Sequence, residues 1–215
     1  MQLQSHDTLD YTVYQKVKDQ IIQKVLKPGE LLVQSQLSQS LGVSRTPLRR
    51  ALAQLEKEGL LESSPKGWYV KKFTRRDIIS VFRIRAVLEG LAARLAANRI
   101  DTPALAFMKT MFEEAYRGVR HQQYEDYYQA DKKFHAMITE AAGDALLSQT
   151  VQSNRIIYNS QIQGLYRDPA ETYPEHMEII AALERRDGSA AERRMREHIE
   201  KAIPILESGE LRIYK

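Results

Sequence analysis

Hydrophobic residues recur at helical spacing through most of this chain, and Gly or Pro interrupts each run. The apolar positions of the first run are Tyr14, Val17, Ile21, Ile22 and Val25. The turn at Pro28-Gly29 ends this helix. A short second helix is predicted for residues 36–41, with Ser35 as its N-cap. Gly42 then turns the chain into a third helix, which ends at Gly59.

The third helix has the pattern of a helix that reads DNA. Its buried face is predicted from the i, i+4, i+7 positions Leu48, Leu52 and Leu55. Cationic and hydroxyl side chains crowd its N-terminal end: Ser44, Arg45, Thr46, Arg49 and Arg50. Backbone N–H groups there can face phosphate, and Arg and Thr can reach phosphates or base edges in the major groove. The alternative is the end of a helical bundle that carries incidental arginines.

The next residues predict a two-stranded β-hairpin. The strands are Leu60-Leu61 and Trp68-Tyr69-Val70, and the turn between them carries Lys66 and Gly67 at its tip. Such a hairpin after two helices is typical of a winged helix-turn-helix. We therefore assign residues 1–73 to a DNA-binding domain.

Residues 74–215 show helical periodicity without a convincing strand. Helices are predicted for about 74–98, 102–119, 122–142, 145–164, from 172 to the turn at 187, and from there to 207. Thr102 and Thr172 are expected to open two of them. The predicted inner positions of the first are Ile78, Val81, Phe82, Ile84, Val87, Leu88, Leu91 and Leu95. About six helices in this length predict an antiparallel all-α bundle, and the fold class is mainly α.

The charge distribution supports this division. Residues 1–75 contain 12 Lys or Arg against 7 Asp or Glu, whereas the rest contain 20 against 21. Phosphate binding needs such a local surplus, and its modest size favours two copies of the domain on DNA. The chain has no Cys, so disulfides and thiol chemistry are excluded. No apolar run reaches the roughly 18 residues of a membrane helix, and no signal peptide is evident, so a cytoplasmic protein is expected.

Three of the five histidines and one aspartate are predicted to converge inside the bundle. Asp131 and His135 are i, i+4 neighbours on one helix face. His176 and His198 each lie 11 residues from Asp187, so an antiparallel hairpin would bring them to the same level. Three imidazoles and one carboxylate suit Zn²⁺, or else Ni²⁺ or Mn²⁺. The alternative is that these are core histidines satisfied by hydrogen bonds.

Arg85 is the candidate clamp for a small carboxylate, because a guanidinium binds a carboxylate through two parallel hydrogen bonds. A salt bridge to Glu89, one helical turn on, is an equally good interpretation. Arg155 and Asn159 are one turn apart and are candidates for the same pocket, or else part of a solvated face. We interpret one aromatic group as core or dimer surface rather than a ligand cage: Tyr124, Tyr127, Tyr128 and Phe134.

Residues 9–75 resemble the winged helix-turn-helix of GntR-family transcription regulators. The matching positions are Pro28-Gly29, Leu37, Leu41-Gly42-Val43-Ser44-Arg45-Thr46-Pro47, Arg49, Ala51-Leu52, Leu55, Glu58-Gly59-Leu60 and Gly67. The resemblance implies that Arg45, Thr46, Arg49 and Gly67 contact DNA. Some members have an Arg where Ser35 stands, and many have a Glu where Arg50 stands. This chain therefore lacks one possible DNA contact at Ser35 and has one additional cation at Arg50.

Residues 76–209 resemble the ligand-binding (FCD) domain of the FadR branch of that family. The matching elements are Arg85-x-x-Leu88-Glu89, Asp131-x-x-Phe134-His135, Glu175-His176 and Met195-x-x-His198-Ile199. The resemblance implies that Asp131 and the three histidines hold a divalent metal ion, which receives a small carboxylate effector together with a nearby Arg. A count of about six helices suggests the subgroup typified by VanR.

The expected function is a ligand-responsive transcription regulator. It would be a homodimer that binds a palindromic double-stranded DNA operator and is released by a small organic acid, hence a repressor. A metalloenzyme with an Asp/His₃ site is the alternative. No HExxH or comparable motif supplies the general base that an enzyme would need.

Overall fold

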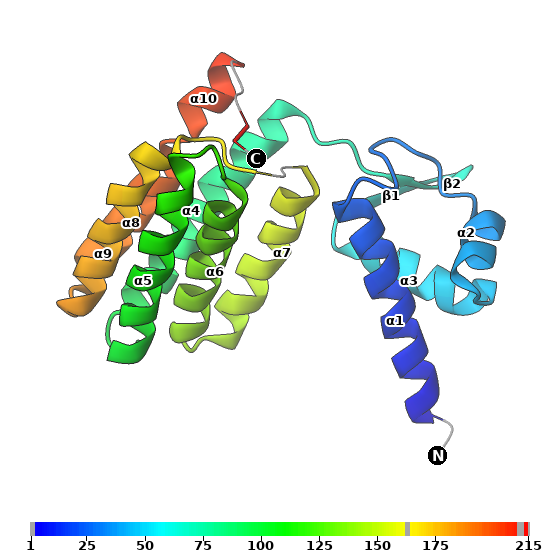
Figure 1. Cartoon of the computed structure of the whole chain (residues 1–215). Coiled ribbons are helices and arrows are strands. Elements are labelled where there is room, and N and C mark those ends of the chain that lie inside the picture. The colour runs from blue at the N-terminus through cyan, green and yellow to red at the C-terminus, as the bar shows by residue number, and fades with distance from the viewer. Residues whose placement is uncertain (1–2, 162–163, 210–212, 215) are drawn as a thin grey trace. The chain divides into compact units, whose positions relative to one another are not determined.

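The computed structural model describes residues 3–161, 164–209 and 213–214, and the side chains of residues 9–153 within the first range (Figure 1). The chain forms two compact units, one from Met1 to Thr74 and one from most of the residues after it. The elements of the first unit are α1 (Leu3–Ile22), α2 (Gln34–Leu41), α3 (Arg45–Lys57), β1 (Leu61–Ser64) and β2 (Gly67–Val70). The mainly helical fold with one small β-hairpin is confirmed.

The turn between α2 and α3 depends on Gly42. Its φ of 67° lies in the left-handed region, which glycine adopts without steric cost. The N–H groups of Gly42 and Val43 donate to the carbonyls of Gln39 and Ser38, and these bonds close α2. Ser35 is not the N-cap of α2, because the helix begins at Gln34, after Val33.

The core of the first unit lies between α1 and α3. The buried side chains of α3 include Leu48, Leu52 and Leu55, as predicted. Those of α1 are Val13, Val17 and Ile21. Val25 was predicted to belong to this stripe, but it lies beyond the end of α1 and is 61% exposed.

The hairpin of β1 and β2 is antiparallel, with Ser64 opposite Gly67 at its tip. Gly67 has a φ of 131°, a conformation that residues with a side chain rarely adopt. Trp68 donates its indole N–H to Glu56 Oε2 at 2.8 Å. Because Glu56 belongs to α3, this bond ties the hairpin to the helix that carries the candidate DNA contacts.

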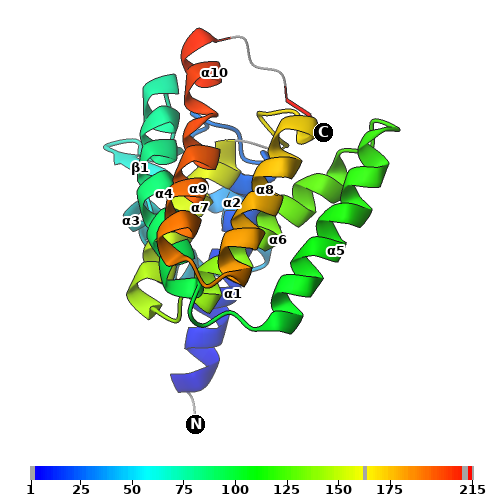
Figure 2. The ribbon, with the colours of Figure 1, turned by 90° about the vertical axis from the view of Figure 1, so that its left-hand side faces the viewer.

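The second unit consists of helices that pack as a closed ring. Its elements are α4 (Arg75–Ala96), α5 (Thr102–Val119), α6 (Glu125–Ala141), α7 (Ala145–Gln161), α8 (Pro169–Glu184), α9 (Gly188–Glu200) and α10 (Ile203–Ser208). Helix α4 packs on α9, α9 on α8, α8 on α5, α5 on α6, and α6 back on α4 (Figure 2). Side chains that point inward from four or five helices therefore meet in one place. Among the described helices, none combines the length and the apolar composition needed to span a bilayer.

An aspartate rather than the predicted threonine caps α5 and α8; α5 spans the predicted residues, whereas α8 begins at Pro169 instead of 172. Asp101 accepts from the N–H of Ala104 at the start of α5, and Asp168 accepts from the N–H of Ala170 at the start of α8. Thr102 and Thr172 consequently lie inside these helices. Helix α6 begins at Glu125 rather than at 122.

The last predicted helix is divided into α9 and α10, which was not expected. Pro204 has no N–H to donate and its ring disfavours a preceding helical turn, and here the helix ends at Glu200 and a new one starts with Pro204 in its first turn. The described part of the second unit therefore holds the helices α4 to α10 rather than about six.

Helix α4 has an exposed apolar stripe as well as a buried face. Ile84, Val87 and Leu91 were predicted to point inward, but they are 46%, 51% and 41% exposed. Helical spacing alone does not show which of two stripes faces the core. The buried face instead includes the charged residues Arg85 and Glu89, together with several alanines.

Candidate metal and effector site

The structure brings together the four residues predicted as metal ligands. Asp131 and His135 project from α6, His176 from α8 and His198 from α9, and one ligand atom of each lies within 4.8 Å of the others. The rings of His176 and His198 are 4.5 Å apart between centroids. Asp187 caps α9 at the turn of the α8–α9 hairpin, so equal distances from this turn place both rings at one level.

Two of the three imidazoles have their Nδ1 atoms engaged by a side chain behind them. His198 Nδ1 lies 2.8 Å from Glu175 Oε2. His176 Nδ1 lies 3.1 Å from the Tyr127 hydroxyl, which is also 3.0 Å from Thr172 Oγ1. If His176 Nδ1–H donates to Tyr127, the phenol can in turn donate to Thr172. Both rings then have the tautomer that leaves Nε2 with a lone pair for a metal ion.

The third imidazole is oriented in the same way. His135 Nδ1 lies 2.6 Å from Glu89 Oε2, as an ion-pair contact. The opposite nitrogens face the aspartate, since Asp131 Oδ1 is 3.2 Å from His176 Nε2 and 3.7 Å from His135 Nε2. Three Nε2 atoms and one carboxylate thus form the inner set.

The electrostatic environment favours the protonation states that bind a metal. Burial lowers the pKa of His135, His176 and His198, so the neutral imidazole is favoured. Burial alone would raise the pKa of Asp131, but its hydrogen bond with His176 holds that pKa well below its usual range. Neutral imidazoles and an ionised carboxylate are the forms that coordinate divalent ions. The residues present therefore fit such an ion.

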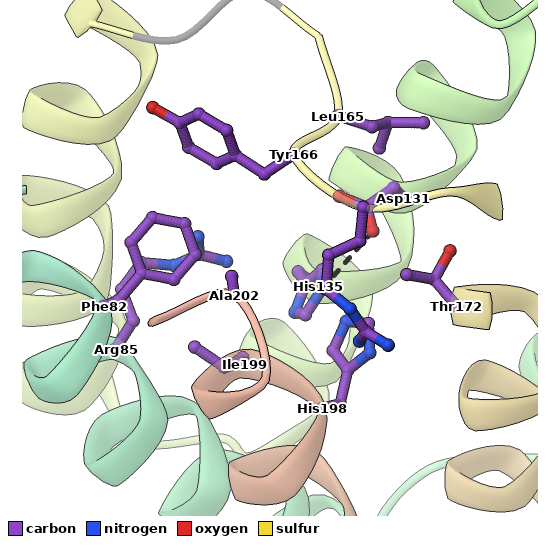
Figure 3. A pocket seen from close by; sticks show the side chains of 11 residues that line it. Phe82, Arg85, Asp131, His135, Leu165, Tyr166, Thr172, His198, Ile199 and Ala202 are labelled. Carbon is purple, nitrogen blue, oxygen red and sulfur yellow. Dashed lines mark ion pairs between the residues drawn. The ribbon is translucent and has the colours of Figure 1, made fainter. Parts of the chain in front are cut away.

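A cavity of about 50 Å³ opens beside these ligands (Figure 3). It is lined by Phe82, Arg85, Asp131, His135, Leu165, Tyr166, Arg167, Thr172, His198, Ile199 and Ala202. In the view of Figure 3, Phe82 and Arg85 lie on one side, and Asp131, His135 and His198 lie on the other. A ligand in this cavity could therefore contact the guanidinium and the metal site together.

The salt bridge of Arg85 to Glu89 is present, and Arg85 also remains at the cavity as a candidate clamp. Its Nε donates to Glu89 Oε1 at 2.7 Å, and the residue is only 6% exposed. The same side chain also lines the cavity. The bond to Glu89 therefore orients the guanidinium beside the cavity rather than removing it from the site. The side chains of Arg155 and Asn159 lie outside the described residues.

Several residues of the site were not predicted from the sequence. Thr172 had been noted only as part of a helix start, Glu175 only as part of an element that resembles the FCD domain, and Tyr127 only as core or dimer surface. Tyr127 and Phe134 are indeed fully buried. Arg167 lies in the segment between α7 and α8, where no periodic pattern marks a buried position. The aspartate that caps α8 at 168 was the one local signal that this segment leads into the site.

The candidate DNA-reading residues are grouped at the N-terminal end of α3. Ser44, Arg45, Thr46 and Arg49 are exposed, and the Ser44 side chain makes no capping bond. Arg50 is also exposed, but it donates to Asp10 of α1 at 2.9 Å. Lys66 is exposed at the hairpin tip beside Gly67.

Comparison with known proteins agrees with both units. Residues 9–70 match the family of bacterial regulatory proteins called the gntR family, and residues 80–201 match the FCD domain. The transcriptional repressor RspR of Escherichia coli is 27% identical over 205 residues, which cover 93% of this chain and 89% of that protein. The uncharacterised regulator YdhC of Bacillus subtilis is 30% identical over 191 residues, covering 86% and 85%. The structure of E. coli McbR has a TM-score of 0.75 at 24% identity, covering 94% and 98%.

Proposed function

Because this chain belongs to the GntR family of transcription regulators and carries an FCD domain, we propose that it is a repressor released from DNA by a small organic acid. The observation that carries this proposal is that Arg85 and three of the four clustered ligand residues, Asp131, His135 and His198, line one small cavity. A relative that is named a repressor supports the direction of regulation. The fold and the relatives are those of regulators and not of enzymes, so the metalloenzyme alternative is not favoured.

The first unit is the DNA-binding part. We place the exposed N-terminal end of α3 in the major groove, where Arg45, Thr46 and Arg49 would contact base edges or phosphates. Lys66 and Gly67 of the hairpin would lie on the adjacent backbone. A palindromic operator suits two such units in a homodimer, and a chromosomal operator implies a cytoplasmic location.

The metal in this proposal is Zn²⁺, with Ni²⁺ or Mn²⁺ as alternatives, held by Asp131 and the three histidines. When bound, it would supply a Lewis acid that accepts a carboxylate oxygen. Arg85 would bind the same acid from the opposite side of the cavity, and its bond to Glu89 fixes the direction of approach. A cavity of about 50 Å³ favours an acid of few atoms.

Metal and acid can be identified in the purified protein by elemental analysis and mass spectrometry. Small carboxylates should then be titrated against the complex with an operator duplex that the protein has selected from random DNA. We expect one of these acids to release the wild-type protein from the operator. Arg85→Lys should need at least about a tenfold higher concentration of the same acid, because Lys keeps the charge but loses the two-point contact. Equal release of both proteins would remove Arg85 from the effector site.

The homodimer has a candidate surface in the exposed apolar stripe of α4. Ile84, Val87 and Leu91 recur at i, i+3 and i+7, and all three are large and solvent-accessible in the single chain. A contiguous exposed apolar stripe of this kind commonly marks a protein–protein interface. Two copies of α4 related by a twofold axis could each cover the other's stripe.

Leu91→Asp should therefore shift the protein from twice 24.8 kDa to 24.8 kDa. A carboxylate at the C-terminal end of the stripe would be desolvated in the dimer, whereas water solvates it in the monomer. Light scattering coupled to size-exclusion chromatography measures the mass. Phe107→Asp, at an exposed aromatic residue on α5, is the matched control and should remain dimeric. A dimeric Leu91→Asp protein would place the interface elsewhere.

A further inference from the structure

The carboxylate of Glu175 binds both a predicted metal ligand and an arginine that lines the cavity. Its Oε2 accepts from His198 Nδ1 at 2.8 Å and from Arg167 Nη1 at 2.6 Å. Its Oε1 accepts from Arg167 Nη2 at 2.9 Å and from Lys201 Nζ at 2.7 Å. The Glu175, Arg167 and His198 side chains are only 8–13% exposed, whereas that of Lys201 is 56% exposed. The first three therefore form a mostly buried chain of contacts.

Arg167 is one of three consecutive residues, 165–167, that line the cavity and that we call the cavity wall. Each of them is attached to a different part of the second unit. Leu165 exchanges two backbone hydrogen bonds with Tyr214, both 3.0 Å long. The Tyr166 ring packs against Phe82 at a centroid distance of 5.7 Å. Arg167 is attached to α8 through Glu175 and, at 3.2 Å, through Glu171 Oε2, and of these two carboxylates Glu175 is the one that contacts a predicted metal ligand.

We propose that Glu175 is a positioning residue that transmits metal binding at His198 to the cavity wall. The inference rests on the metal site proposed above. A metal ion on His198 Nε2 requires the proton on Nδ1, and it makes this N–H a stronger donor to Glu175. A carboxylate held at one oxygen in this way presents both oxygens to the guanidinium in the two-point geometry that arginine prefers. Metal binding would thereby hold Arg167, and with it residues 165–167, in the arrangement described above.

Glu89 provides a matched comparison. It lies against His135 as Glu175 lies against His198, and it also holds an arginine of the cavity, Arg85. Arg85, however, belongs to helix α4 and not to the cavity wall. Both carboxylates should therefore support the metal, whereas only Glu175 should connect the metal to the wall.

Hydrogen exchange of residues 164–168, measured by mass spectrometry with and without saturating Zn²⁺, tests the connection. In wild type, Zn²⁺ should slow exchange of this segment by roughly tenfold. Glu89→Gln should require about 10–100-fold more Zn²⁺ but reach the same protection once saturated. Glu175→Ala should also bind Zn²⁺ more weakly. When it is saturated with Zn²⁺, its residues 164–168 should still exchange as fast as in the metal-free protein.

Arg167→Lys separates this connection from a general loss of folding, because it leaves Glu175 and His198 intact. It should bind Zn²⁺ with an affinity close to that of wild type and still lose most of the zinc-dependent protection. Circular dichroism confirms that each variant is folded. Full protection of residues 164–168 in zinc-saturated Glu175→Ala would overturn the proposal. The proposal would also fail if Zn²⁺ binds to wild type without changing hydrogen exchange of this segment. A wild type that binds no Zn²⁺, Ni²⁺ or Mn²⁺ would instead refute the metal site itself.

Discussion

Arg45→Ala or Arg49→Ala should abolish specific operator binding while the protein stays folded and dimeric. Both side chains are exposed at the end of α3 that we place in the major groove. A bidentate contact to a base is worth about 1–3 kcal/mol, and a dimer loses it twice, so affinity should fall by roughly 30-fold to 20,000-fold. Fluorescence anisotropy with a labelled operator duplex measures the loss.

Arg50→Ala is the control for this prediction. Arg50 is paired with Asp10 of α1, so we expect its replacement to change affinity much less. Any effect should appear mainly as a smaller dependence of binding on salt concentration, as expected for a phosphate contact. If Arg50→Ala and Arg49→Ala lose affinity equally, a different face of α3 enters the groove.

His198→Ala should lose metal binding and effector response, yet still bind the operator. Wild type at a metal concentration 1,000 times its Kd should gain about 4 kcal/mol in the free energy of unfolding of the second unit. His198→Ala should show no such gain, because one of the four ligands is missing. Thermal unfolding with Zn²⁺, Ni²⁺, Mn²⁺ or a chelator, together with elemental analysis, measures the difference.

His121→Ala is the matched control, since His121 is exposed and lies outside the ligand cluster. It should bind metal and respond to the effector as wild type does. An effector that releases wild type and metal-free His198→Ala equally well would show that the metal is structural. The account of sensing would then fail, although DNA recognition would not.

The parts of the fold that were predicted correctly depend on local sequence. The helix-turn-helix is defined by Gly42 and by the leucine spacing of α3, and these two signals lie close together in the sequence. The ligand cluster was also predictable, because Asp131 and His135 share one helix and a single turn relates His176 to His198. In each case the geometry of one helix or one hairpin suffices.

The residues that were missed depend on distant partners. Tyr127 meets His176 from 49 positions away, and Glu175 meets His198 from 23 positions away. Nothing near these residues in the sequence indicates such pairs. The exposed stripe of α4 was assigned to the core because two apolar faces of one helix have the same periodicity. The break at Pro204, by contrast, was readable from the sequence and was overlooked.

Helix α4 carries Arg85 on one face and the stripe of Ile84, Val87 and Leu91 on the other. A helix moves nearly as a rigid rod, so a ligand that pulls on Arg85 also displaces the stripe. If two such stripes meet across a twofold axis, displacement in one protomer disturbs the same helix of its partner. Binding of acid to the two protomers would then be cooperative, and the operator would be released over a narrow range of acid concentration.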